Sequence, residues 1–187
     1  MSKVIVVGGV PASGKTTLMQ AFIGRHEGWS GLKLAPLVDG IFNIGKQVAV
    51  IGKYKPYYPL KKNDFEGTDK LSMAVQPAML KFINTTPDTK CVMEGDRLFT
   101  RSFLEGLERP QEVEVIILTA SERDLGERHT ARGDTQTEGW LASRDTKVAR
   151  IRDWLEGQTA IRWREETHIN PQDTELIVDS MWEGWYG

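Results

Sequence analysis

Cysteine and histidine are scarce in this sequence of 187 residues, which has one cysteine and three histidines. A single cysteine excludes an intrachain disulfide and a cysteine-rich zinc site. Cys91 lies in an apolar run, and we interpret it as a small core residue. His129 and His168 have no Cys or His partner at the spacing of metal ligands, so we interpret both as surface or structural residues.

Long apolar runs and an excess of one charge are missing too. No apolar segment is long enough to cross a bilayer, and the chain passes from Met1-Ser2-Lys3 straight into a strand-like run, which leaves no room for a signal peptide. The formal net charge is -2, unlike a strongly basic nucleic-acid-binding protein. We therefore expect a cytoplasmic protein that has no membrane partner and forms one domain, residues 1–187.

A complete phosphate-binding loop stands near the N-terminus. Residues 9–16 read Gly-Val-Pro-Ala-Ser-Gly-Lys-Thr, between a β-branched run at 4–7 and a helical segment from 17. A strand followed by a helix N-terminus aims backbone N–H groups and the helix dipole at one anion site. The alternative is a Gly-rich turn that binds nothing. The context favours ATP as cofactor, bound by Gly9, Ala12, Ser13, Gly14, Lys15, Thr16 and Thr17.

Two side chains of this loop have predicted chemical roles. Lys15 supplies a mobile positive charge for the β- and γ-phosphates, and the Thr16 hydroxyl is placed to ligate Mg²⁺. Lys15 is therefore also a predicted catalytic residue. The loop alone does not decide what happens to the phosphate.

Predicted strands and helices alternate along most of the chain. Strands are expected at 32–38, 90–94, 112–118 and 175–178. Helices are expected at 17–25, 70–84, 100–107, after a Ser121 cap to 132, and at 139–164 with a possible break at Gly157. Asp39-Gly40 signals a tight turn, 41–44 and 47–54 favour an antiparallel hairpin, and 180–187 favours a strand or a packed tail.

This alternation predicts an α/β P-loop NTPase fold. It has a parallel core sheet with helices on both faces, a small β-hairpin insertion and a helical lid at about 123–147. Arg128 and Arg132 share a face of one lid helix before a break at Gly133, so they are candidates to close over the triphosphate. The alternative is a charged helix surface. Trp140, Trp154 and Trp163 fall at rough helical spacing and are expected in the core.

A phosphoryl-transfer site also needs a metal-binding acid, a residue that binds the acceptor and a general base, and the sequence offers candidates for each. Glu94 ends a predicted strand, where an acid is placed to hold Mg²⁺, and Arg97 follows closely enough to reach an anionic acceptor. Asp39 and Asp69 compete for the role of general base. Asp39 is also explained by a turn with Gly40, and Asp69 by a helix cap, so both assignments stay open.

A lysine-rich stretch follows the predicted hairpin. Between residues 40 and 63 there are five lysines and no acidic residue, with tyrosines interleaved. Such mixing suits phosphate contacts and base stacking, and it equally suits a solvated loop. Lys53, Tyr54 and Lys55 are the acceptor-binding candidates in this stretch.

The loop at 9–16, the strand that ends in Glu94 and the Arg128/Arg132 pair together resemble the small P-loop kinases of the nucleoside monophosphate and polynucleotide kinase group. Residues 65–77, Phe-Glu-Gly-Thr-Asp-Lys-Leu-Ser-Met-Ala-Val-Gln-Pro, are similar to a segment of the bacteriophage kinases that phosphorylate 5-hydroxymethyluracil in DNA. The hairpin at 32–54 departs from the compact second-strand region of the group.

The resemblance implies transfer of the ATP γ-phosphoryl group to a hydroxyl of a nucleotide or of a DNA base, as in phage DNA hypermodification. ATP and Mg²⁺ are then the cofactors, and the partner is DNA with a modified base or a nucleotide. Two other functions stay open: a kinase for a free nucleotide or small metabolite, and a P-loop ATPase that acts as a switch. The sequence leaves the oligomeric state open.

Overall fold

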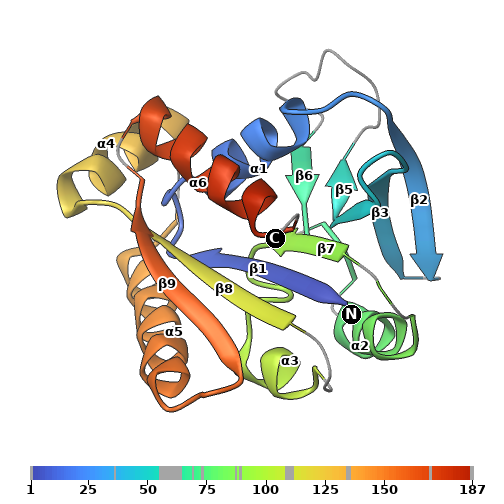
Figure 1. Ribbon diagram of the computed structural model, residues 1–187. Helices are drawn as coiled ribbons and strands as arrows, with labels where there is room; N and C mark the ends of the chain where they lie inside the picture. The colour runs from blue at the N-terminus through green and yellow to red at the C-terminus, as the bar shows by residue number, and fades with distance from the viewer. Residues whose placement is uncertain are drawn as a thin grey trace.

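The chain folds around one seven-stranded sheet. The computed structural model describes residues 2–35, 37–54, 65–68, 70–72, 74–86, 88, 90–107, 112–133, 136–168 and 170–185. The strand order is β2-β3-β4-β7-β1-β8-β9 (Figure 1). Its last five strands run parallel: β4 (Val48–Ile51), β7 (Lys90–Glu94), β1 (Lys3–Gly9), β8 (Glu112–Thr119) and β9 (Ile161–Thr167). The predicted parallel core sheet is confirmed.

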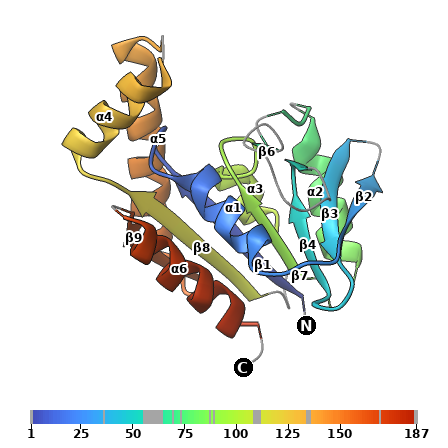
Figure 2. The ribbon, with the colours of Figure 1, turned by 90° about the horizontal axis from the view of Figure 1, so that it is seen from above.

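Helices cover both faces of this sheet, as predicted (Figures 1 and 2). On one face lie α1 (Lys15–Gly24) and α6 (Pro171–Glu183), and on the other lie α2 (Val75–Thr85), α3 (Arg101–Glu105) and α5 (Glu138–Glu156). Ile5 and Val7 of β1 point into the first buried cluster, whereas Val4 and Val6 point into the second. Burial on both faces explains why β1 is an unbroken apolar run.

The hairpin insertion forms the edge of the sheet next to β4. Strands β2 (Trp29–Ala35) and β3 (Val38–Asn43) are antiparallel, and β3 pairs antiparallel with β4, which confirms the predicted hairpin. The predicted Asp39-Gly40 turn is wrong, because both residues lie within β3. Val38 and Ile41 are buried in clusters on opposite faces of the sheet, as residues three apart in a strand are, and Gly40 between them pairs with both β2 and β4. Strands β5 (Lys53–Tyr54) and β6 (Phe65–Gly67) form a second, small sheet.

The C-terminal part departs twice from the predictions. Helix α5 ends at Glu156 with Gly157 as its cap, and 161–164 belong to β9 instead of the helix. Arg162 and Arg164 form ion pairs with acidic residues of β8. These charges make β9 look like a helix surface in the sequence, but they are common on an edge strand such as β9.

The predicted last strand, 175–178, is part of helix α6 instead. Asn170 and Asp173 form a capping box at its start, with a proline in the first turn. Its end packs on α1, where Trp182 stacks on Phe22 with ring centroids 4.4 Å apart. Among the described residues, none of the helices combines the length and apolarity that a bilayer span needs.

Candidate active site

The phosphate-binding loop joins the carboxyl end of β1 to α1. Neighbouring strand β7 lies on one side of β1 and β8 on the other, so the chain order reverses at this point of the sheet. Open α/β sheets bind ligands at such a reversal. Ala12 and Gly14 have left-handed backbone, with φ of 63° and 100°, which turns successive N–H groups inward. Lys15 Nζ donates to the carbonyl groups of Gly9 and Val10, at 3.0 and 2.8 Å.

The loop contacts His168, which directly follows β9, and Arg128 of α4 (Glu122–Arg132), and Thr174 of α6 holds the His168 ring. His168 is 6% exposed, and its ring fills the space that a side chain at Gly14 would need. Its Nε2 lies 2.5 Å from the Thr174 hydroxyl. Burial, and secondarily the Arg128 guanidinium, lowers the pKa of His168 below its ordinary value. His168 is thus a structural residue, and it supports the loop.

Arg128 belongs to the same support. Its guanidinium donates to the carbonyl groups of Ala12, at 3.1 Å, and of His168, at 2.7 Å. The sequence predicts this arginine over the transferring phosphoryl group, whereas in this structure it holds the loop backbone. The side chain of Arg132 lies outside the described part of the structure, so its predicted role remains a proposal.

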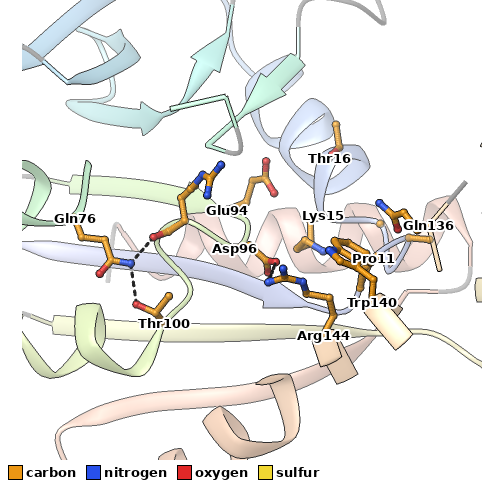
Figure 3. Close-up of a pocket in the computed structure, with 13 residues that line it drawn as sticks. Pro11, Lys15, Thr16, Gln76, Glu94, Asp96, Thr100, Gln136, Trp140 and Arg144 are labelled. Atoms are coloured by element: carbon orange, nitrogen blue, oxygen red, sulfur yellow. Dashed lines mark hydrogen bonds and ion pairs between the residues drawn. The ribbon is translucent and has the colours of Figure 1, made fainter. Parts of the chain in front are cut away.

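A pocket of about 570 Å³ opens in front of the loop (Figure 3). Its walls come from the loop and α1, the carboxyl end of β7, and helices α2 and α5. Its lining residues are Pro11, Ala12, Gly14, Lys15, Thr16, Gln76, Glu94, Asp96, Arg97, Thr100, Gln136, Trp140 and Arg144. Of the other predicted cofactor-binding residues, Gly9 and Ser13 are buried within the loop, and Thr17 is exposed outside the lining.

Glu94 lies at the carboxyl end of β7, beside β1, as predicted. It is 5% exposed, and its carboxylate lies against Gly67 at the end of β6. Gly67 has a φ of 61°, and a Cβ there would collide with the Glu94 carboxylate. The Thr68 hydroxyl also donates to the Glu94 carbonyl. The small β5–β6 sheet therefore fixes the position of Glu94.

Asp96 connects the turn after β7 to helix α5. Its carboxylate lies 2.8 Å from Arg144 Nη1 and 3.5 Å from Lys147 Nζ. Lys147 Nζ also donates to the Asp96 carbonyl at 3.1 Å. Arg97, the predicted acceptor-binding residue, lines the same pocket. Asp96 thus ties two residues of α5 to the turn after β7: Arg144, which lines the pocket, and Lys147.

Sequence reasoning missed Gln76 and Trp140 as pocket residues. Gln76 donates to the Arg97 carbonyl at 2.7 Å and lies 3.1 Å from the Thr100 hydroxyl, which joins α2 to the β7 turn. Trp140 lines the pocket with the Arg144 guanidinium 4.9 Å from its ring centroid. The i, i+4 spacing of Trp140 and Arg144 in the sequence indicates that the two side chains share a helix face.

The acceptor candidates of the insertion lie outside this pocket. Asp39 is half-buried in β3 and does not line the pocket. Its backbone carbonyl accepts a hydrogen bond from the N–H of Gly52, the residue after β4. Tyr54 is 8% exposed and packs in the buried cluster on the α1 face, so its ring is no exposed stacking surface. Lys53 is exposed. Asp69 and Lys55 lie outside the described residues.

The oxygen donors of the pocket fit Mg²⁺. Thr16 and Glu94 line it together, and both offer hard oxygen ligands. Mg²⁺ is usually bound through one or two protein oxygens together with substrate phosphates and water. The described residues contain no cluster of three or more His, Cys, Asp or Glu that could hold a metal ion.

Comparisons with known proteins agree with this geometry. The model of a family described as P-loop Nucleotide Kinase3 matches residues 1–170, whereas no curated protein matches the sequence. A gluconokinase structure from Sinorhizobium meliloti 1021 is 18% identical, with a TM-score of 0.50 over 98% of this chain and 95% of its own.

A sugar kinase structure from Janibacter sp. HTCC2649 is 14% identical, with a TM-score of 0.48 over 100% and 95% of the two chains. At 18% identity, the likeness to the gluconokinase structure shows a shared fold and nothing more. The family match includes the phosphate-binding loop, Glu94 and helices α3, α4 and α5. The chain belongs to the P-loop nucleotide kinase family and is an ATP-dependent kinase.

Proposed function

We propose that this kinase transfers the ATP γ-phosphoryl group to a hydroxyl of a nucleotide or of a nucleic-acid base, with 5-hydroxymethyluracil in DNA as the favoured acceptor. One observation carries the proposal: a single pocket joins the phosphate-binding loop to cations and hydrogen-bonding groups of other elements, namely Arg97, Arg144 and Gln76. Such a pocket holds a donor phosphate and an anionic acceptor side by side.

The donor side has a role for each loop residue. The loop N–H groups and Lys15 hold the phosphates, and Thr16 with Glu94 holds Mg²⁺. When bound, Mg²⁺ neutralises charge on the β- and γ-phosphates. To contact the phosphates, the Lys15 ammonium must leave the carbonyl groups of Gly9 and Val10.

The charge-neutralising arginine is more readily supplied by α5 than by α4. Arg128 would have to release two carbonyl groups to enter the pocket, whereas Arg144 already lines it. Arg132 remains a candidate for lid closure. Asp39 and Asp69 remain candidates to orient the acceptor hydroxyl. Of the two, Asp39 reaches the sheet edge that bears Glu94 but not the pocket lining.

DNA as the acceptor is supported by the segment at 65–77 and by the basic insertion before it. Its Gly67-Thr68 part contacts Glu94, so this segment adjoins the reacting centre. A base within a duplex must leave the stack before its hydroxyl enters a pocket of about 570 Å³. Exposed Lys53, with Lys55, Lys61 and Lys62, is the proposed contact to the DNA backbone.

A free nucleotide or a small anionic metabolite is the second candidate acceptor. The pocket volume suits a small ligand, and one structure of the same fold is a gluconokinase. This acceptor would use the same loop and arginines without the lysines of the insertion.

Radiolabelled ATP distinguishes these acceptors. The enzyme is offered DNA containing 5-hydroxymethyluracil, ordinary DNA, free nucleotides, gluconate or no acceptor. We expect label in the modified DNA. Label in free nucleotides alone would redirect the proposal to the second candidate, and label in gluconate alone would exclude a base-bearing acceptor.

The role of the insertion has its own test. Replacing Lys53, Lys55, Lys61 and Lys62 together with glutamine should weaken DNA binding and flatten its dependence on salt, because fewer counterions are released. Kinase activity on a free nucleotide serves as the control. Unchanged DNA affinity would remove the lysines from the proposed acceptor site.

A further inference from the structure

The turn after β7, residues 95–100, supplies part of the pocket lining and is anchored at its base. The Gly95 N–H donates to the Val7 carbonyl of β1 at 3.2 Å. Phe99 is buried, and its ring fills the space that a side chain at Gly8 would need. The base of the turn is thus fixed to the strand that leads into the phosphate-binding loop.

The tip of the same turn is held from two sides through its backbone. Gln76 Nε2 of α2 donates to the Arg97 carbonyl at 2.7 Å, and Lys147 Nζ of α5 donates to the Asp96 carbonyl at 3.1 Å. These contacts engage the backbone, whereas the side chains of Asp96 and Arg97 line the pocket. Two helices therefore determine how the turn presents these side chains.

The amide of Gln76 has one orientation in this network. Because the Arg97 carbonyl can only accept, the Gln76 nitrogen must face it. The same nitrogen donates to the Thr100 hydroxyl at 3.1 Å, and the Ser102 hydroxyl donates to the Gln76 amide oxygen at 3.4 Å (Figure 3). Gln76 is thus an ordered side chain that holds the turn through both ends of its amide.

Gln76 and Thr100 lie at the end of the pocket opposite the phosphate-binding loop, with Glu94 and Asp96 between the two ends in Figure 3. The loop and the N-terminus of α1 bind the donor phosphates. An in-line transfer needs the acceptor on the side of the γ-phosphate that faces away from the loop. In this pocket that side is the end with Gln76 and Thr100.

We propose that Gln76 is a positioning residue for acceptor binding: by holding the Arg97 carbonyl, it directs the Arg97 guanidinium at an anionic group of the acceptor. The inference rests on the proposed function, in which Arg97 binds the acceptor, and adds a residue that acts through Arg97 instead of on the acceptor itself. It also assigns a task to the part of the segment 65–77 that lies in the pocket.

Asn84 provides a matched control on the same helix. Its side-chain amide also donates to a backbone carbonyl, that of Gly106 at 3.0 Å, but Asn84 does not line the pocket. Gln76→Met and Asn84→Leu each remove the amide with little change in size and no added charge. Each variant loses a hydrogen bond between α2 and the segment around α3, so both should lower Tm, and only Gln76→Met should change acceptor binding.

Steady-state kinetics with 5-hydroxymethyl-2′-deoxyuridine monophosphate as acceptor measure this difference. We expect Gln76→Met to raise the acceptor KM about 5- to 30-fold, because a hydrogen bond is lost and the Arg97 guanidinium is no longer aimed. The KM for ATP should stay unchanged in both variants, and the acceptor KM should stay unchanged in Asn84→Leu. An unchanged acceptor KM in Gln76→Met, or an equal rise in Asn84→Leu, would overturn the inference.

A double-mutant cycle with Arg97→Gln tests whether Gln76 acts through Arg97. Arg97→Gln should itself raise the acceptor KM, and Gln76→Met should add little to it, because the side chain being positioned is gone. A full effect of Gln76→Met in the Arg97→Gln background would overturn the inference, since Gln76 would then contact the acceptor directly. These results leave the proposed function standing. A wild-type enzyme that phosphorylates no nucleotide and no DNA base would refute the proposed function and this inference together.

Discussion

The donor side and the acceptor side of the pocket are built in different ways. The donor side is one continuous stretch, residues 9–16, whose Lys15 contacts carbonyl groups of the same loop. The proposed acceptor side combines Gln76 of α2, Arg97 after β7 and Arg144 of α5, which meet only in the folded chain. A change on the donor side should therefore affect transfer to every acceptor, whereas a change on the acceptor side should depend on which acceptor is offered.

Replacing Lys15 with alanine should have the largest effect. Without its charge, the transferring phosphoryl group loses a preorganised cation, and kcat should fall on the order of 10²- to 10³-fold with every acceptor. Lys81→Ala, which removes an exposed lysine of α2, should leave kcat unchanged. Radiolabel transfer measures both. A loss confined to one acceptor would contradict the division between the two sides.

Gly67→Ala tests the boundary between the two sides. The new Cβ must displace the Glu94 carboxylate, so we expect kcat to fall roughly 10- to 100-fold through a misplaced metal ligand. Gly133→Ala is the matched control, because Gly133 has nearly the same φ, 63° against 61°, with no atom within 4 Å of the added Cβ. Both substitutions strain the backbone alike, by about 1–3 kcal/mol.

Activity per folded molecule separates these two effects. Circular dichroism gives the folded fraction of each variant, and labelled ATP gives its turnover. If Gly67→Ala and Gly133→Ala lose the same activity, backbone strain alone explains the loss, and Glu94 is not positioned by Gly67.

The sequence was sufficient for the donor side because the motif is local. A strand, a loop of fixed spacing and a helix are consecutive, so Thr16 and Lys15 needed no tertiary information. Glu94 was predictable for a related reason, since the carboxyl ends of parallel strands share one edge. The fold class followed from the alternation of elements.

The errors arose where a local pattern competes with packing. Arg162 and Arg164 fit the charged surface of the predicted helix at 139–164, but in the structure they pair with Glu112 and Glu114 of the neighbouring strand β8. Trp140 and Trp154 lie on the same helix and cannot be told apart in the sequence. In the folded chain, Trp140 lines the pocket and Trp154 packs against the core. Asp39-Gly40 has the composition of a turn but is held in β3 by buried neighbours.

Asp96→Asn should have a smaller effect, which we expect in the acceptor KM. It removes the charge that holds Arg144 and Lys147, a half-buried pairing of modest strength, so we expect the acceptor KM to rise about fivefold. The KM for ATP should stay unchanged. Glu105→Gln, which breaks the exposed Arg101 pair on α3, is the control and should change neither constant.

A double-mutant cycle makes this prediction sharper. If Asp96 acts by holding Arg144, then Asp96→Asn should add little to Arg144→Gln, since each removes the same pairing. Fully additive losses would show that Asp96 and Arg144 act on the acceptor independently.

The smallest expected effect is a pH dependence of stability that originates behind the donor loop. Burial lowers the pKa of His168 in the folded chain below its ordinary value of 6.5, so the unfolded chain binds the proton more readily. Stability should be full above pH 6.5 and decline as the pH falls below it, which lowers Tm by roughly a few degrees at pH 5.5. Burial also lowers the pKa of His26, so part of the decline should persist in His168→Gln and disappear in the double variant with His26→Gln. Thermal unfolding at pH 5.5 and 7.5 measures this decline. If His168→Gln retains the whole decline, the neutral imidazole behind Gly14 does not carry it, and the donor loop owes its support to Arg128 instead.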